Sequence, residues 1–206
     1  VMNAAAFNMN VTGATSVAGT GTLTSTTGTE TFDGTFSSAG TTTFGTSATD
    51  FNSSITISAG TTTFTSGTTT IATNFTHSGG TFTHNSGTVT FDASVDHIIT
   101  GTNTWNILSF SEASNDTTTS TITLPATLTQ TIVTSLSLGG LDANDLLTII
   151  SSSAGSPATF DMTSASTLAT PNFISVKDNT ILDNSSAFTT PVDPTNSVNV
   201  SGNTNW

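Results

Sequence analysis

Large apolar residues recur along the first half of the chain at intervals of about 20 residues, with Thr, Ser and Gly between them. The motif Gly-Thr-x-Thr followed by a large apolar residue begins at Gly19, Gly40, Gly60 and Gly101, and a degenerate copy, GTFTH, begins at Gly80. Successive copies start 21, 20, 20 and 21 residues apart. Self-similarity at such a period is typical of repeat architectures.

Three columns of side chains keep this spacing. Their members are Leu23, Phe44, Phe64 and Trp105, with His84 in the degenerate copy; Phe32, Phe51, Ile71 and Phe91; and Phe36, Ile55, Phe75 and Val95. Alternate residues of a strand face opposite sides, so we expect the columns to point inward and the intervening Thr outward. The pattern predicts an all-β protein, a parallel β-solenoid (β-helix) with turns of about 20 residues stacked at about 4.8 Å. An amphipathic helix is disfavoured, because no stretch keeps a 3.6-residue apolar period.

The organisation changes along the chain. Residues 1–18 precede the repeats and are expected to form an N-terminal strand or cap, with exchange between subunits as one interpretation. Residues 19–206 are expected to form a single β-solenoid domain, regular over 19–110 and degenerate over 111–206, where Leu, Ile and Val replace Phe. The chain starts at Val1 without an initiator Met or a secretory signal pattern, which we interpret as a mature subunit or a segment of a longer protein.

Composition alone leaves two interpretations open. The chain has 206 residues, of which 51 are Thr and 29 are Ser, and such richness is found both in disordered segments and in β-structure. The 13 Phe residues are spaced at regular intervals, which favours an ordered β-protein.

Charge and the available side chains exclude several classes of function. Lys177 is the one basic residue against 13 acidic ones, so we expect no nucleic-acid binding. There is no Cys, and no apolar run approaches the roughly 18 residues of a membrane span, so we expect neither thiol chemistry nor membrane insertion. With three His, two Glu and no Arg, we expect no enzyme, no catalytic residues and no cofactor.

The segment from His77 to Asp92, HSGGTFTHNSGTVTFD, resembles the tandem β-solenoid repeats of very large secreted bacterial surface proteins of the adhesin-like kind. GTNTWNILSF, from Gly101 to Phe110, and the closing GNTNW resemble the way such segments continue and end. The resemblance implies a fold and an extracellular, cell-surface setting. It brings no catalytic or binding residues, because the family has none in common.

Two groups of residues contain side chains of the types that bind metal ions. His77 and His97 are 20 residues apart, so we expect them in one column about 5 Å apart, but no third ligand accompanies them. Asp142, Asn144 and Asp145 are calcium-type ligands without the repeat of calcium-binding β-rolls, and a turn explains them equally well. Stacked polar residues in turns are the preferred interpretation of both, and we expect no metal. Lys177 beside Asp178 is expected to be a surface residue on a turn rather than part of an isopeptide bond.

The repeats also contain regular Thr-x-Thr pairs. These pairs are Thr20/Thr22, Thr41/Thr43, Thr61/Thr63, Thr81/Thr83 and Thr102/Thr104. We expect them to form two outward files on one face, similar to those of ice-binding solenoid proteins. Selection for β-propensity explains Thr at these positions as well.

The N-terminal segment alternates Ala5, Phe7, Met9 and Val11 with smaller or polar residues. Such a strand suits addition to the open end of a neighbouring subunit or folding back as a cap on its own first turn. The first hypothesis is therefore an extracellular structural protein, a self-assembling surface filament or adhesin subunit whose partners are copies of itself in a head-to-tail homopolymer. The alternatives are an ice-binding (antifreeze) protein and an adhesin module that binds surface glycans.

Overall fold

The fold prediction is confirmed by a computed structural model that describes residues 1–91, 95–111, 119–185 and 188–206. The described chain is a parallel β-solenoid without helices, and each circuit of it is called a coil below. Its strands are β1 (Met2–Ala5), β2 (Met9–Val11), β3 (Thr15–Val17), β4 (Thr22–Ser25), β5 (Glu30–Phe32), β6 (Phe36–Ser38), β7 (Thr41–Thr43), β8 (Thr49–Phe51), β9 (Ile55–Ile57), β10 (Thr61–Thr63), β11 (Thr68–Ile71), β12 (Phe75–His77), β13 (Thr81–Thr83), β14 (Thr88–Phe91), β15 (His97–Thr100), β16 (Asn103–Ser111), β17 (Thr121–Leu124), β18 (Thr129–Gly139), β19 (Leu147–Ser151), β20 (Ala158–Met162), β21 (Thr167–Leu168), β22 (Ile174–Lys177), β23 (Asn179–Asp183) and β24 (Val198–Ser201).

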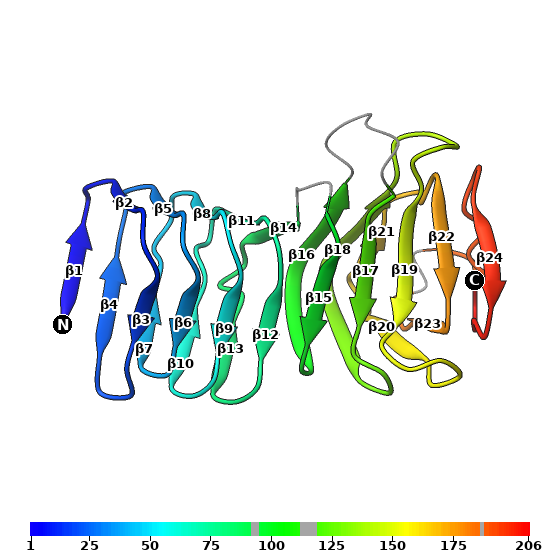
Figure 1. The fold of residues 1–206 in the computed structure, drawn as a ribbon. Coiled ribbons are helices and arrows are strands. Elements are labelled where there is room, and N and C mark those ends of the chain that lie inside the picture. Colours follow the sequence, from blue (N-terminus) through cyan, green and yellow to red (C-terminus); the bar gives the residue numbers. More distant parts are fainter. Residues whose placement is uncertain (92–94, 112–118, 186–187) are drawn as a thin grey trace.

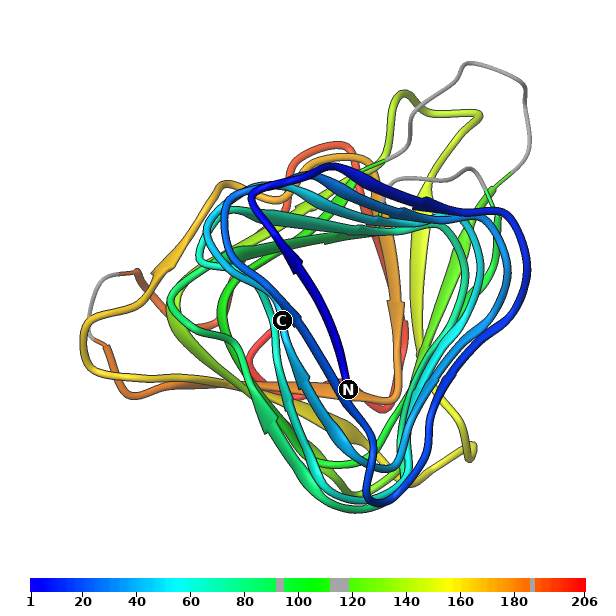
Figure 2. The ribbon, with the colours of Figure 1, turned by 90° about the vertical axis from the view of Figure 1, so that its left-hand side faces the viewer.

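Three parallel sheets enclose one core, and the rod has a roughly triangular outline when viewed along its axis (Figure 2). Sheet A has the order β1-β4-β7-β10-β13. Sheet B runs β2-β5-β8-β11-β14-β16-β18-β20-β23, with β21 paired to β18, and sheet C runs from β3 through β6, β9, β12, β15, β17, β19 and β22 to β24. The nine strands of sheet C correspond to nine coils, and the chain termini lie at opposite ends of the rod (Figure 1).

The three sheets differ in how many side chains they present to solvent. In sheets B and C, the three-residue strands β5, β6, β8 and β9 bury their first and third residues and direct the middle one outward. The short strands of sheet A do the reverse, because the middle residue of β7 and β10 is buried and the two flanking residues are not. Sheet A therefore displays two outward side chains per coil.

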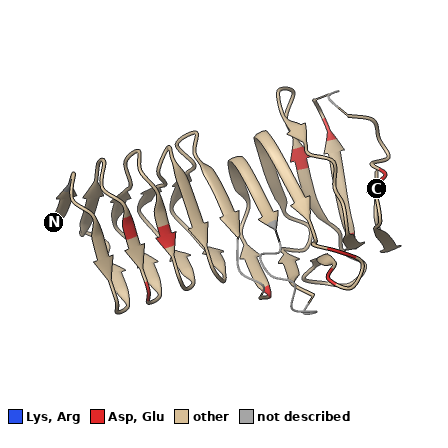
Figure 3. Ribbon diagram, turned by 90° about the horizontal axis from the view of Figure 1, so that it is seen from above, with Lys and Arg blue, Asp and Glu red and all other residues tan. Residues whose placement is uncertain are grey.

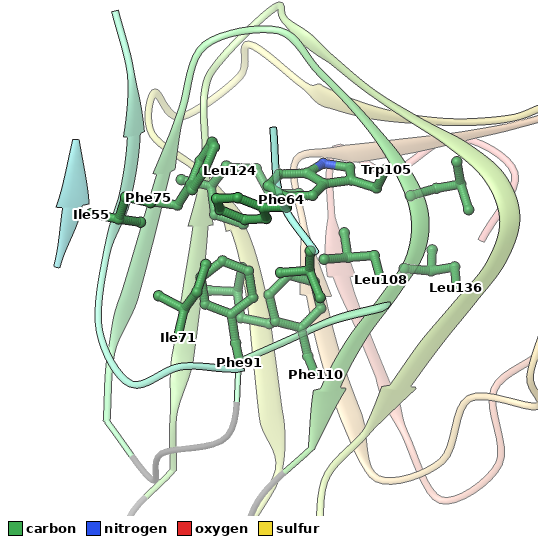
Figure 4. Packing of buried hydrophobic residues seen from close by; sticks show 14 of the residues in the cluster. Ile55, Phe64, Ile71, Phe75, Phe91, Trp105, Leu108, Phe110, Leu124 and Leu136 are labelled. Atoms are coloured by element: carbon green, nitrogen blue, oxygen red, sulfur yellow. The ribbon is translucent and has the colours of Figure 1, made fainter. Parts of the chain in front are cut away.

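The second predicted column is confirmed and continues further than expected. Phe32, Phe51, Ile71 and Phe91 pair in register along sheet B, and Phe110 extends the column. The Phe91 and Phe110 rings stack with their centroids 4.9 Å apart (Figure 4). Aromatic stacking and burial of this kind stabilise the core along the rod axis.

The third column is correct only through its first three members. Phe36, Ile55 and Phe75 pair in register, but Phe75 is followed by Ile99. Val95 is 43% exposed and stacks on none of them. The cause is a longer connection between β14 and β15, which moves the register forward by four residues.

Only part of the first column keeps one register. Phe44 and Phe64 are buried as expected, and each follows a Thr of the same paired file, but Leu23 is out of register with them and Trp105 lies in sheet B beside Ile132. Leu23 pairs with Thr42, and the same inward position continues through Thr62 to Phe82. The buried Phe44 and Phe64 lie one residue beyond the ends of β7 and β10. Some Thr side chains therefore belong to the core: those of Thr42 and Thr62 are fully buried, and the Thr42 hydroxyl lies 3.0 Å from that of Ser38.

Glycine is required where the chain turns from sheet C into sheet A. Gly60 has a φ of +66°, and a Cβ there would lie 2.1 Å from the carbonyl oxygen of Gly40 in the preceding coil. Gly80 has a φ of +85°, and a Cβ would again meet backbone atoms of the coil before it. Gly60 and Gly80 thus let consecutive coils approach to hydrogen-bonding distance at this corner.

The C-terminal half is less regular, as expected. Phe110 pairs with Leu138, so one coil there takes 28 residues where those before it took 19 to 21. The long strands β16 and β18 lie beside each other in sheet B, and sheet A ends at β13 (Figure 1). Nowhere in the described part of the chain is there a helix with the length and apolar character needed to span a lipid bilayer.

Candidate functional site

The outward residues of sheet A form a regular array of threonines. Thr22, Thr41, Thr61 and Thr81 pair in one file, and Thr24, Thr43, Thr63 and Thr83 pair in the other. These eight residues, called the threonine grid below, occupy β4, β7, β10 and β13. Adjacent rows are about 4.8 Å apart because they belong to neighbouring strands, and the two files are separated by two residues, or about 6.6 Å.

The grid differs at both ends from the files predicted from sequence. Thr20 lies in the connection before β4, and the first row consists of Thr22 and Thr24. Thr102 and Thr104 are exposed but leave sheet A: Thr104 belongs to β16 and pairs with Thr131 of sheet B. The motif that begins at Gly101 therefore resembles the others in sequence without continuing the sheet.

The grid hydroxyls are available to a partner. None of them hydrogen-bonds to another group in the described ranges of the chain. Elsewhere on the surface, the hydroxyl of Ser47 donates to the Thr27 carbonyl at 2.6 Å, and that of Thr70 donates to the Asp50 carboxylate at 2.5 Å. The outward files of sheets B and C are mixed in this respect, because Thr70 is engaged by Asp50 whereas Thr56 and Thr90 make no side-chain hydrogen bond in the described ranges.

The N-terminal end of the rod is a second candidate surface. The edge strands β1, β2 and β3 surround a hollow of about 570 Å³, whose apolar lining includes Met9, Val17, Leu23 and Phe32. Figure 2 views the rod from this end. The hollow is a cross-section of the core, open between the edges of the three sheets.

The predicted subunit-contact strand is two strands. A turn in which the Phe7 N–H donates to the Ala4 carbonyl separates β1 from β2. Phe7 is therefore 78% exposed at a corner, while Met9 is 9% exposed and Val11 is half-buried beside the hollow. Ala5 ends β1 and pairs with Ser25. The period-two alternation was thus misleading, because the chain bends between Ala5 and Met9 and forms the first coil of the solenoid on itself.

The C-terminal end is better covered. Phe188, Val192 and Trp206 pack against the core there. The last strand, β24, is exposed at all four residues, and beside it lies a hollow of about 430 Å³ that includes Val198 and Trp206 in its lining. The two ends of the rod therefore differ in shape.

The expected pairing of His77 with His97 is wrong. The four-residue shift places His97 beside the strand connection at Thr73, whose carbonyl lies 2.7 Å from the His97 Nδ1 atom. The His77 Nδ1 atom lies 2.9 Å from the Asn103 Oδ1 atom instead. His84 is half-buried after β13, and burial lowers the pKa of its imidazole.

Two buried polar features were not predicted from sequence. Where sheet A ends, the Gln130 Oε1 atom accepts hydrogen bonds from Asn103 Nδ2 and Trp105 Nε1, both at 3.0 Å. Near the N-terminal end, Glu30 is 1% exposed in the inward column of sheet B, and burial raises the pKa of its carboxyl. The column of Glu30 continues through the buried Thr49 and Thr69, so no repeat of apolar residues marked it as an inward position in the sequence.

The acidic residues lie at scattered points along the rod (Figure 3). Asp142 accepts a hydrogen bond from the Asn144 backbone and belongs to a turn, as the sequence suggested. Over the described ranges, no group of three or more His, Cys, Asp or Glu residues is placed to hold a metal ion. Lys177 ends β22, between Ile150 and Ser201 of the neighbouring strands.

Comparison of the chain with protein-family models, with curated proteins and with solved structures gave no match. The geometry of the two surfaces is therefore the basis on which function is proposed.

Proposed function

We propose that the chain is a structural protein of the extracellular surface, a rigid β-solenoid rod that assembles end to end with copies of itself as a filament or adhesin subunit. The observation that carries the proposal is the N-terminal end face, with three strand edges around an apolar hollow. The composition is consistent with this setting, because a chain with one basic residue and no Cys offers few sites to trypsin-like proteases and is insensitive to redox conditions.

The N-terminal face presents the same kinds of groups through which neighbouring coils contact each other inside the rod. Through β13, each coil offers the next one strand edges in all three sheets and an apolar cross-section between them; beyond β13 the strand edges belong to sheets B and C. The first coil of the described chain presents the same elements at its N-terminal face. Exposed strand edges pair readily with another chain, so the occupant we propose for this face is the C-terminal coil of a second copy, whose β23 and β24 would continue sheets B and C. A contact between two different ends is heterologous and does not close, so it produces a filament.

The free edge of β2 allows a specific test. The Met9 N–H donates to Thr29 and the Val11 carbonyl accepts from Asp33, so both residues use their backbone groups toward β5. The backbone groups of Asn10, between them, point to the open edge. Proline lacks the N–H but is tolerated on edge strands. We expect Asn10→Pro to fold normally and to lose end-to-end assembly, and Asn10→Thr to retain both.

Sedimentation velocity over a concentration series measures this assembly, and circular dichroism monitors the fold. The proposal predicts linear oligomers that lengthen with concentration for the native chain and for Asn10→Thr, but not for Asn10→Pro. Monomers at every concentration for all three proteins would contradict it and would favour preceding coils of one polypeptide as the occupant of the end face.

A further inference from the structure

The threonine grid is chemically uniform where the other faces of the same coils are not. The matching outward file of sheet B contains Asn10, Thr31, Asp50, Thr70 and Thr90, and that of sheet C begins with Ser16, Ser37, Thr56 and Thr76. All three faces have the same requirement for residues that fit a β-sheet. Since that requirement is met with Asn, Asp and Ser elsewhere, β-propensity alone does not account for eight threonines on sheet A.

The geometry of the grid is repetitive and rigid. Each row is fixed to its neighbours by the parallel pairing of β4, β7, β10 and β13. Threonine is stiff at χ1, so its hydroxyl and methyl groups take few positions once the backbone is fixed. The grid is therefore an ordered surface of hydroxyl and methyl groups, and its side chains lose little conformational entropy when a partner binds.

The grid is also free of formal charge, although the whole chain has a net charge of −12. None of its hydroxyls is engaged by another group in the part of the chain that the structure describes. A partner that matches this face must therefore be uncharged, rich in hydrogen-bond donors and acceptors, and periodic in two directions. Crystalline water has all three properties.

We propose that the threonine grid binds an ordered layer of water and, through it, the surface of an ice crystal. The hydroxyls hold water molecules at the spacing of the rows and files, and the methyl groups between them keep that layer from rearranging around the protein. This activity is independent of end-to-end assembly, because the grid lies on the side of the rod and the assembly contact at its end.

Thermal hysteresis and the partition of fluorescently labelled protein into a growing ice hemisphere test the proposal. We expect both for the native chain, loss of both in Thr61→Tyr, and retention in Thr56→Tyr, which places the same bulk on sheet C. Thr61→Val, which keeps the shape of the side chain but removes the hydroxyl, should lower hysteresis without changing the fold. Asn10→Pro should leave hysteresis unchanged, which separates this proposal from the assembly proposal.

Absence of hysteresis and of ice partition in the native, folded chain would overturn the proposal. Equal losses in Thr61→Tyr and Thr56→Tyr would also overturn it, because the effect would not belong to sheet A. Retention of the native chain on an insoluble crystalline polysaccharide, without ice binding, would assign the grid to a different partner.

Discussion

At the scale of single residues, threonine has two roles that composition does not distinguish. In the GTTTF motif that begins at Gly40, Thr41 and Thr43 face outward while Thr42 is fully buried between them. Strand alternation was sufficient to predict two outward files. The next inward residue, Phe44, is buried as expected, but alternation alone did not show that Thr42 pairs with the core residue Leu23 of the preceding coil.

Glu30 is the residue whose chemistry is least suited to its position. Thr49 donates a hydrogen bond of 3.1 Å to its carboxylate, but burial is the larger effect and raises the pKa of the carboxyl above its ordinary value. The folded state therefore binds this proton more tightly than the unfolded state does. Protonated Glu30 therefore contributes to stability. This contribution is fully present below the pKa that Glu30 has in the unfolded chain, and it is lost as pH rises through the higher pKa of Glu30 in the folded chain.

Replacing Glu30 with Gln tests whether the buried carboxylate of Glu30 lowers the stability of the fold at neutral pH. We expect Glu30→Gln to increase the free energy of unfolding at pH 7 by about 1 kcal/mol, because no charge then has to be buried. The gain should disappear on acidification, as the native carboxyl becomes protonated. Urea unfolding at pH 7 and at pH 4 measures both effects, with the exposed Asp193→Asn as the control. A loss of stability at pH 7 in Glu30→Gln would show that the carboxylate is satisfied where it lies.

At the scale of elements, the strands and their inward columns were predictable and the connections between them were not. The column through Phe51 and Phe91 followed from spacing alone, since equal coil lengths keep like residues in register. The column through Phe75 failed at Val95 because one longer connection displaces every later residue. The end of sheet A at β13 was not predictable either, because the next motif keeps the sequence pattern while its strand joins sheet B.

The register of sheet A can be measured by cross-linking, since the native chain has no Cys. Thr22 pairs with Thr41, so their Cα atoms lie about 4.8 Å apart, within the range of a disulfide. Thr20 lies two residues before Thr22, and its Cα is displaced beyond that range. We expect Thr22→Cys with Thr41→Cys to form an intramolecular disulfide under mild oxidation, and Thr20→Cys with Thr41→Cys to remain reduced. The opposite result would restore the register predicted from sequence and remove the first row of the grid.

At the scale of the whole molecule, the two proposed surfaces use different directions of the rod. The end faces lie on the axis, where coils already join, and the threonine grid lies on one side. The net charge of −12 opposes side-by-side association while permitting growth along the axis. The solenoid architecture was predictable from the sequence period. The shapes of its ends were not, because the first coil is formed by residues outside the repeat.

Cryo-electron microscopy of the intact chain at high concentration tests the central claim most directly. Nine coils stacked at about 4.8 Å give each copy a length of about 43 Å along the axis. End-to-end assembly predicts unbranched filaments with a subunit repeat close to that length and with β-strand spacing that continues across each joint. Single rods that stay monodisperse at every concentration, or filaments joined through their sides, would contradict the account.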